Sequence, residues 1–194
     1  MSKNYFDHKE IIDKYSKVIV TGPHGAGNKI TAYIIDSDYD NLTHERWEEI
    51  IYNDETFKDK LNSSDNYVAF CPSCSGLLHK SIDELKDVLV IFMYKDIEEI
   101  KNYRERNNII QSINAYEYPI YEEFINNEGS HLNLSIEDDG LEEVTYTLWE
   151  KYQKELIPNY IEIEHSSLSE HWKWVPKNKR TNFKEWQTQI KEKP

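Results

Sequence analysis

A glycine-rich stretch near the N-terminus has the residue types and spacing of a phosphate-binding loop. Residues 18–31 are VIVTGPHGAGNKIT, in which an apolar run is followed by Gly22 and then by Gly27. These glycines fit the first part of the motif G-x-x-x-x-G-K-[ST], whose backbone N–H groups surround phosphate oxygens. The helix expected to follow adds positive potential at its N-terminus. The spacing therefore predicts a site for phosphate or sulfate oxygens, formed by Gly22, Pro23, His24, Gly25, Ala26, Gly27, Asn28 and Lys29.

The last two of these positions depart from the motif. Asn28 stands where the motif has lysine, and Lys29 stands where it has the hydroxyl residue that contacts magnesium. Asn28 donates hydrogen bonds without charge, so Lys29 is the cation available to a phosphate. We therefore expect anion binding without a metal site on the protein, and the need for magnesium stays open. In the alternative interpretation, the glycines only form a tight turn between a strand and a helix.

Basic residues follow a second strand candidate, residues 88–94. Lys95 comes directly after it, and Arg104 and Arg106 lie on the helix predicted next. The carboxyl ends of strands are where α/β sheets bind ligands, and arginine is suited to bidentate contact with phosphate. Lys95, Arg104 and Arg106 are thus candidate catalytic residues that would hold a second phosphate. The alternative is a solvated helix whose charges are balanced by Glu98, Glu99 and Glu105.

Two further chemical groups admit a functional and a structural interpretation. His24, inside the glycine stretch, is a candidate donor to an anion or a candidate general base, or else an exposed turn residue. Cys71 and Cys74 form a C-x-x-C pair, but zinc would need two more ligands and a thioredoxin-like dithiol would follow the first strand. We therefore expect both cysteines to be small buried side chains at the end of a strand.

The composition limits the partners of this chain. A formal net charge of −13 over 194 residues argues against a protein that coats DNA or RNA through phosphate contacts. No apolar run approaches the roughly 18 residues needed to cross a bilayer, and the N-terminus lacks the apolar stretch of a signal peptide. Two cysteines fit a reducing compartment. We expect a cytoplasmic protein that binds no membrane and holds an anionic ligand locally.

The elements that must position these residues alternate between strand and helix. Apolar runs predict buried strands at residues 17–21, 67–70, 88–94 and 160–164. Helical spacing predicts helices at residues 6–15, 29–36, 55–61, 97–108 and 141–156, and one that starts at Thr43 and places Trp47, Ile50 and Ile51 on one face. This order predicts a three-layer α/β fold with a mainly parallel sheet of at least four strands and helices on both faces.

The chain length suits one domain, which we expect at residues 1–165. Residues 166–194 form an extension that is basic and rich in tryptophan in an otherwise acidic protein. Its aromatic and cationic side chains would suit closure over a nucleotide, or docking on a protein partner or a second copy of the chain. In the remaining interpretation, the extension packs on its own domain.

The segments VTGPHGAGNK and VLVIFMYKDIEEIKNYRER together resemble the P-loop NTPase superfamily, and within it the sulfotransferase-like branch and small phage-encoded P-loop proteins. The resemblance covers residues 16–106. It implies that the loop holds a 5'-phosphosulfate without the Walker lysine, and that Lys95 lies near the basic position that contacts a nucleotide 3'-phosphate. The chain departs from this branch at Asn28 and Lys29, at Tyr94, where arginine is common, and at Asn102, which stands near the usual serine. A phage-encoded protein would act in the host cytoplasm.

Three functions are open at this point, two enzymatic and one not. The first is transfer of a sulfuryl or phosphoryl group from a nucleotide such as 3'-phosphoadenosine 5'-phosphosulfate to a small acceptor. In it, Lys29 neutralises the charge that develops on the donor, and Lys95, Arg104 or Arg106 assists. The second is a nucleoside or nucleotide kinase that uses ATP and magnesium. The third is a catalytically inactive module that engages a protein partner through the extension.

Overall fold

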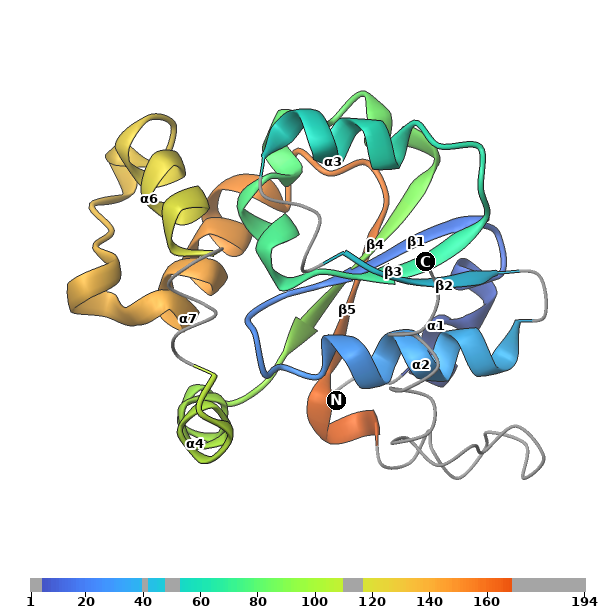
Figure 1. Ribbon diagram of the computed structural model, residues 1–194, viewed down its shortest axis with the longest axis horizontal. Helices are drawn as coiled ribbons and strands as arrows, with labels where there is room; N and C mark the ends of the chain where they lie inside the picture. Colours follow the sequence, from blue (N-terminus) through green and yellow to red (C-terminus); the bar gives the residue numbers. More distant parts are fainter. Residues whose placement is uncertain (1–4, 40–41, 48–52, 110–116, 169–194) are drawn as a thin grey trace.

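The computed structural model describes residues 5–39, 42–47, 53–109 and 117–168 (Figure 1). Five parallel strands form one sheet in the order β2-β3-β1-β4-β5. The strands are β1 (Lys17–Thr21), β2 (Thr43–Arg46), β3 (Tyr67–Phe70), β4 (Val88–Tyr94) and β5 (Tyr160–Glu164). The four predicted strands are confirmed at their predicted bounds, and β2 is a fifth.

Helices connect and cover these strands. They are α1 (Tyr5–Ile12), α2 (Asn28–Asp38), α3 (Asp54–Leu61), α4 (Ile97–Asn107), α6 (Tyr118–Asn126) and α7 (Ile136–Leu148). Short helical turns complete the described chain: η1 (Pro72–Gly76), η2 (Leu78–Lys80), η3 (Glu84–Asp87), η4 (Ser130–Leu132), η5 (Trp149–Gln153) and η6 (His165–Ser167). Asp96 caps α4, because its side chain accepts a hydrogen bond of 3.1 Å from the backbone N–H of Glu99.

The segment from Thr43 is a strand, and the predicted helix there is wrong. Thr43 N donates to Asn66 O (3.0 Å) and Trp47 N donates to Phe70 O (3.3 Å), which fixes β2 along β3. Burial alternates here, since Leu42 and His44 are buried while Thr43 is exposed. Pairing with the open edge of β3 outweighs the local helical pattern. Ile50 and Ile51, which the predicted helix included, lie outside the described residues.

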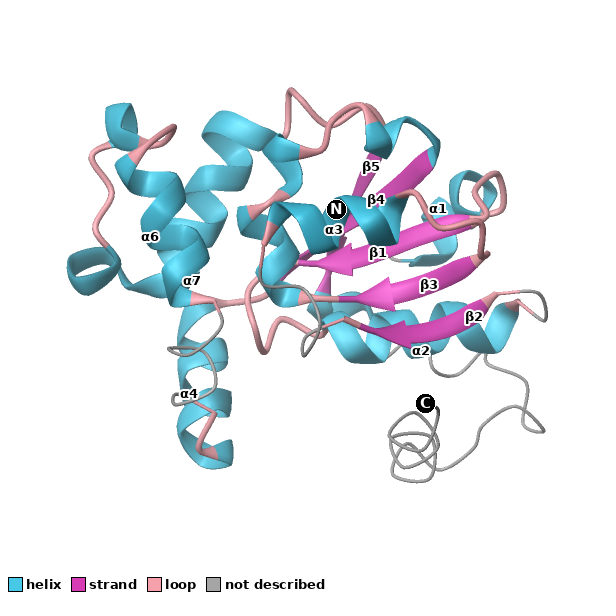
Figure 2. Cartoon of the chain, turned by 45° about the horizontal axis from the view of Figure 1, so that its top comes forward, coloured by secondary structure: helices cyan, strands magenta, loops and turns pink. Residues whose placement is uncertain are grey.

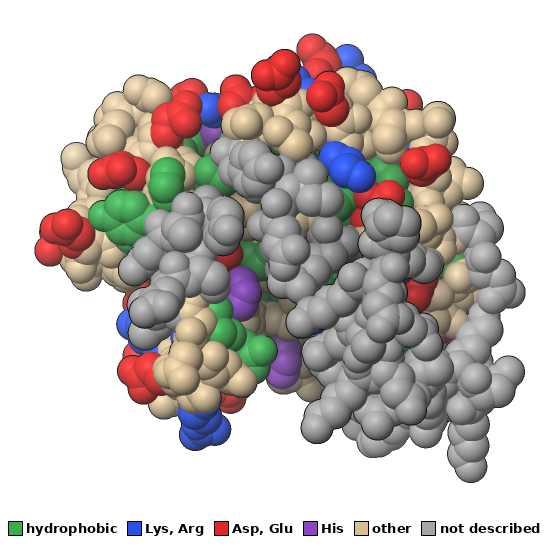
Figure 3. Space-filling model, in the orientation of Figure 1, with side chains coloured by type: hydrophobic (Ala, Val, Ile, Leu, Met, Phe, Trp, Pro, Cys, Tyr) green, Lys and Arg blue, Asp and Glu red, His purple; other side chains and the backbone are tan. Residues whose placement is uncertain are grey.

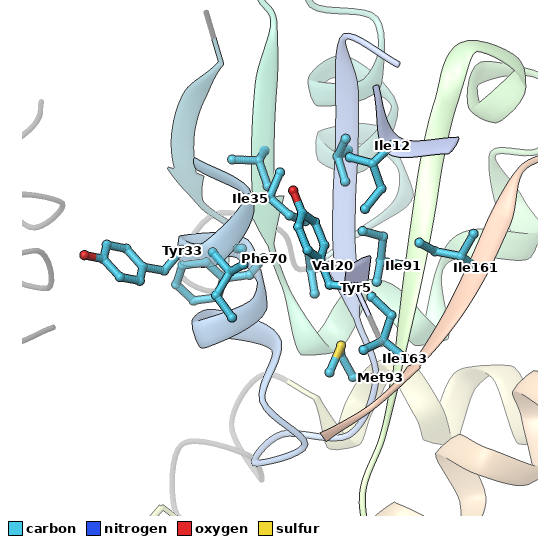
Figure 4. Packing of buried hydrophobic residues seen from close by; sticks show 14 of the residues in the cluster. Tyr5, Ile12, Val20, Tyr33, Ile35, Phe70, Ile91, Met93, Ile161 and Ile163 are labelled. Carbon is cyan, nitrogen blue, oxygen red and sulfur yellow. The ribbon is translucent and has the colours of Figure 1, made fainter. Parts of the chain in front are cut away.

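Apolar side chains fill both faces of the sheet, which makes the fold three-layered α/β. Val18 and Val20 face α1 and α2, whereas Ile19 faces α3 and Trp149. Figure 4 shows the first of these cores, with Val20, Ile91 and Ile163 from the sheet against Tyr5, Ile12 and Ile35 from the helices. A β-strand buried on both faces needs apolar residues without alternation, which is why the central strands were predictable.

α6 and α7 form a small helical unit beyond the sheet, and the strands point towards it (Figure 2). It has its own apolar cluster, built by Tyr121, Phe124, Leu141, Val144 and Leu148. Trp149, just after α7, anchors the unit to the sheet: its ring stacks on Phe92 with 4.3 Å between centroids, and its indole N–H donates to Glu162 (2.9 Å). The loops at the carboxyl ends of the strands therefore lie between the sheet and these helices.

The strand order creates a point at which the chain leaves neighbouring strands in opposite directions. β1 is followed by β2 on one side of the sheet, whereas β4 is followed by β5 on the other. In parallel α/β sheets, ligands bind outside the carboxyl ends of the strands at such a switch point. The ends of β1 and β4 therefore define the candidate site, and the glycine stretch and Lys95 follow these two strands.

Two findings concern the rest of the chain. Within the described ranges, no helix has the length and apolar character that crossing a membrane requires. Of the predicted C-terminal extension, only residues 166–168 are described, and Leu168 packs into the core shared with α1 and α2. The tryptophans and cations on which its predicted role depends lie outside the described residues.

Candidate functional site

The glycine loop, defined here as residues 22–29, connects β1 to α2. Its three glycines have positive φ angles, 131° at Gly22, 102° at Gly25 and 101° at Gly27. The strain-free use of such angles is a property of glycine. Ala26 lies between two of these glycines and has no positive φ, so the backbone alternates between left-handed and ordinary conformations. This alternation favours a concave arrangement of N–H groups that can surround an anion.

Some N–H groups of this loop are used within the protein and others are not. Gly22 N donates to Ser75 Oγ (3.2 Å), and Ala26 N donates to Pro23 O (3.0 Å). The N–H groups of Gly25 and Gly27 have no acceptor in the described part of the chain. They precede α2, whose dipole adds positive potential at this end. They are thus the donors available to an anion.

Asn28 holds the loop together from inside. Its side chain is buried, with the residue 4% exposed, and Nδ2 donates to Gly22 O and Pro23 O at 3.1 Å each. Asn28 Oδ1 has no partner among the described residues. The side-chain N–H groups of Asn28 are therefore hydrogen-bonded to the loop itself. Only the backbone N–H of Asn28 is left for the predicted ligand contact.

Lys29 and Lys95 lie on opposite sides of the glycine loop. The Lys29 ammonium is 5.7 Å from the ring centroid of Phe70, the last residue of β3. Lys95 follows β4, on the other side of β1, and its side chain is only 12% exposed. Its ammonium is 3.8 Å from a carboxylate oxygen of Glu99 and 5.8 Å from the ring centroid of Tyr103. The sheet order thus gives the site one lysine on each side.

The backbone of Lys95 is fixed by Tyr146 of α7. Lys95 N donates to the Tyr146 hydroxyl (2.9 Å), and this hydroxyl donates to Lys95 O (2.8 Å). Burial is the main cause that raises the pKa of Tyr146 to about 12, so the hydroxyl keeps the proton it donates. The helical unit therefore sets the position from which the Lys95 side chain starts.

Of the two predicted arginines, the structure brings Arg104 to the loop and leaves Arg106 on the exposed side of α4. Arg104 is 6% exposed; its Nε donates to His24 O (2.9 Å) and its Nη1 pairs with the buried carboxylate of Glu142 on α7. Nη2 has no partner among the described residues. Arg104 therefore links the loop, α4 and α7. His24 contributes its carbonyl to this link, and its side chain is partly buried.

Two residues that sequence reasoning did not assign contact the glycines of the loop. A Cβ built on Gly27 would lie 2.6 Å from His165 Cδ2, and one on Gly25 would lie 3.1 Å from Tyr103 Cδ1. The pKa of His165 is lowered from its ordinary value by burial and by the Lys95 charge, against the opposing effect of Glu99. The available signal was positional, because His165 directly follows a predicted strand and must lie at the same sheet edge as the loop.

Ser75 was also missed as a support of the loop, whereas the expectation for the cysteines is confirmed. Ser75 Oγ lies 2.8 Å from Thr21 Oγ1 and accepts from Gly22 N, and all three residues are buried. Cys71 and Cys74 are free and buried, and burial raises the pKa of the Cys74 thiol, which disfavours a reactive thiolate. In the described part of the chain, no group of three or more histidine, cysteine or acidic residues is placed to hold a metal ion.

The fold and the site define an α/β protein with a glycine-rich turn at the switch point of a parallel sheet. Histidine and hydrophobic side chains come to the surface side by side next to α4 on the face shown in Figure 3.

The chain matches no protein-family model, no curated protein and no solved structure. Its function is therefore inferred from the geometry of this site.

Proposed function

We propose that this protein binds a phosphorylated adenine nucleotide at the glycine loop and transfers a sulfuryl or phosphoryl group from it to a small acceptor. The observation that carries the proposal is the pair of N–H groups at Gly25 and Gly27, which precede α2 and have no acceptor in the described residues. Backbone N–H groups at the start of a helix bind phosphate and sulfate oxygens without any need for a metal ion.

The charges around the loop support an anionic ligand. Lys29 lies towards β3, Lys95 follows β4, and Arg104 bonds to the carbonyl of His24. A protein with a formal net charge of −13 repels anions over most of its surface, so a local group of cations is needed to hold one. As negative charge develops on the leaving oxygen, the loop N–H groups and Lys29 would stabilise it.

The residues after Gly27 favour 3'-phosphoadenosine 5'-phosphosulfate over a magnesium complex of ATP as the donor. Lys29 replaces the hydroxyl that contacts magnesium in the usual motif, and an ammonium group is no metal ligand. Lys95, on the far side of β1 from Lys29, is the candidate partner of a second phosphate. Arg104 instead positions the loop, because its Nε and Nη1 are already bonded within the protein.

The test is ligand binding measured by thermal unfolding and by calorimetry. We expect adenosine 3',5'-bisphosphate to raise Tm without magnesium, since a ligand at 100 times its Kd stabilises the folded state by about 2.7 kcal/mol. A response to ATP that requires magnesium would favour the kinase. Tm values that none of adenosine 3',5'-bisphosphate, ATP, ADP or sulfate changes would overturn the proposal and favour the inactive module.

Matched glycine variants separate binding from stability. Gly27→Ala places a methyl group against His165 in the site, whereas Gly140→Ala imposes the same kind of strain within α7, at a φ of 77°. We expect both variants to be destabilised and only Gly27→Ala to lose the response to adenosine 3',5'-bisphosphate. Equal losses in the two variants would mean that the response reports global stability rather than binding at the loop.

A further inference from the structure

His165 and Lys95 come from the ends of neighbouring strands and meet at the glycine loop. His165 follows β5 and lies against Gly27, where a Cβ would be 2.6 Å from its Cδ2. Lys95 follows β4, whose last residue Tyr94 pairs with Glu164 of β5, and its ammonium lies 5.8 Å from the ring of Tyr103, which packs on Gly25. The charged groups that act on the imidazole are Lys95 and, in the opposite sense, Glu99. The Glu99 side chain is 67% exposed, so solvent weakens its tendency to raise the pKa of His165.

Two groups that both become cationic are unfavourable neighbours unless an anion lies between or beside them. In the free protein, the lowered pKa of His165 favours the neutral imidazole. An anion at the N–H groups of Gly25 and Gly27 would raise the pKa of His165 again, because its negative charge favours the protonated ring. The proton would come from solvent and bind to a ring nitrogen of His165.

A buried cation bonded to the loop also keeps one donor without a partner in the described residues. Arg104 is 6% exposed and its Nη2 has no hydrogen-bond partner among the described residues, while its Nε is bonded to the loop at His24. An unsatisfied N–H of a buried guanidinium is costly. Nη2 therefore adds positive potential beside the loop, while Nε and Nη1 hold the loop in position.

We propose that His165 and Lys95 complete the anion site of the glycine loop, and that binding of a doubly charged sulfate or phosphate group is coupled to uptake of a proton by His165. This inference rests on the proposed function, because it requires an anion at the loop. It goes further in naming the residues that contact the anion from β4 and β5 and in making the affinity dependent on pH. The affinity increases as pH falls through the pKa of His165.

The first test follows the ring signals of the histidines by NMR as pH is varied, with and without sodium sulfate. The signal of His165 is assigned by its loss in His165→Gln. We expect sulfate to raise the pKa of His165 and to shift the backbone N–H signals of Gly25 and Gly27. Sulfate that shifts these glycine signals and leaves the pKa of His165 unchanged would overturn the inference and leave the proposed function standing.

The second test measures sulfate affinity by calorimetry at about pH 6 and about pH 8, on either side of neutrality. His165→Gln should bind sulfate about tenfold more weakly than the natural chain at the lower pH, the effect of one charge-assisted hydrogen bond, and should lose the pH dependence. His131→Gln, at an exposed histidine of η4, is the control and should behave like the natural chain. An unchanged affinity in His165→Gln would overturn the inference.

Lys95→Met gives a readout that needs no ligand. Without the ammonium, the pKa of His165 in the free protein should rise, whereas the sulfate affinity should fall by about tenfold. A merely structural Lys95 would move neither quantity in a folded variant. If no preparation, including the natural chain, shows any sulfate-dependent shift at Gly25 and Gly27, the proposed function fails and the inference fails with it.

Discussion

The glycine loop has two parts that differ in what satisfies their polar groups. The first part is bonded within the protein: Gly22 N to Ser75, the carbonyls of Gly22 and Pro23 to Asn28, and the carbonyl of His24 to Arg104. The second part has the N–H groups of Gly25 and Gly27, which find no acceptor in the described chain and lie next to Tyr103 and His165. Bonds to the protein hold a loop in shape, and groups left open at a sheet edge are available to a ligand.

This comparison separates residues whose loss should lower stability from residues whose loss should lower anion affinity. Arg104, Glu142, Asn28 and Gly22 belong to the first set, and Gly25, Gly27, Lys95 and His165 belong to the second. Each variant below is expected to change one quantity more than the other. Unfolding in urea gives the free energy of unfolding, and calorimetry with sulfate gives the affinity.

The largest effect is expected from breaking the buried ion pair between Arg104 and Glu142. Glu142→Leu leaves the guanidinium buried without its carboxylate, since both residues are at most 6% exposed. Removal of one partner of a buried pair costs about 3–5 kcal/mol, so the midpoint of urea unfolding should fall sharply. Glu143→Gln is the matched control, because the side chains of Glu143 and Lys101 are 33% and 42% exposed, so solvent screens their attraction and the loss should be small. Equal effects of the two variants would contradict the structural role of Arg104.

The second effect concerns Gly22, whose surroundings are backbone rather than a mobile side chain. A Cβ at Gly22 would lie 2.7 Å from the carbonyl oxygen of Met93, and its φ of 131° is unfavourable for alanine. Gly22→Ala should lower the free energy of unfolding by about 1–3 kcal/mol. Gly27→Ala also has a positive φ, but its methyl group meets side chains, His165 at 2.6 Å and Leu168 at 3.3 Å, which can move, so it should lower stability less and sulfate affinity more. The opposite ranking would show that the two parts of the loop do not differ as described.

The positions of these residues also show how much could be predicted from the sequence. β1, β3, β4 and β5 are apolar runs and carry their own signal, whereas β2 is an edge strand whose conformation depends on pairing with β3. The glycine loop was predictable because its spacing is local. Its supports were not: Ser75 is 53 residues from Gly22 and Arg104 is 80 residues from His24. Such contacts depend on strand order, which local patterns do not encode.

A third, smaller effect is expected at Asn28. Asn28→Ala removes two hydrogen bonds and leaves the carbonyls of Gly22 and Pro23 without these donors. The net loss should be about 1–2 kcal/mol in the free energy of unfolding. Sulfate affinity should fall only as far as the loop loosens, because the side-chain N–H groups are bonded within the protein. A large loss of affinity at unchanged stability would instead mean that Asn28 contacts the anion directly.

The smallest effect is expected from Arg106, and it tests the comparison within a single helix. Arg104 and Arg106 are the same residue type two positions apart on α4, but Arg104 is buried against the loop while Arg106 is exposed. Arg106→Gln should change the free energy of unfolding by less than about 0.5 kcal/mol, as surface substitutions usually do. Its charge acts on the site only through solvent, where salt screens it within about 10 Å at 0.1 M ionic strength. Sulfate affinity should therefore change less than about twofold, and even this change should vanish as salt is raised. A loss in Arg106→Gln as large as that in Lys95→Met would place Arg106 at the anion when ligand is bound, and α4 would then have to turn its outer face towards the loop.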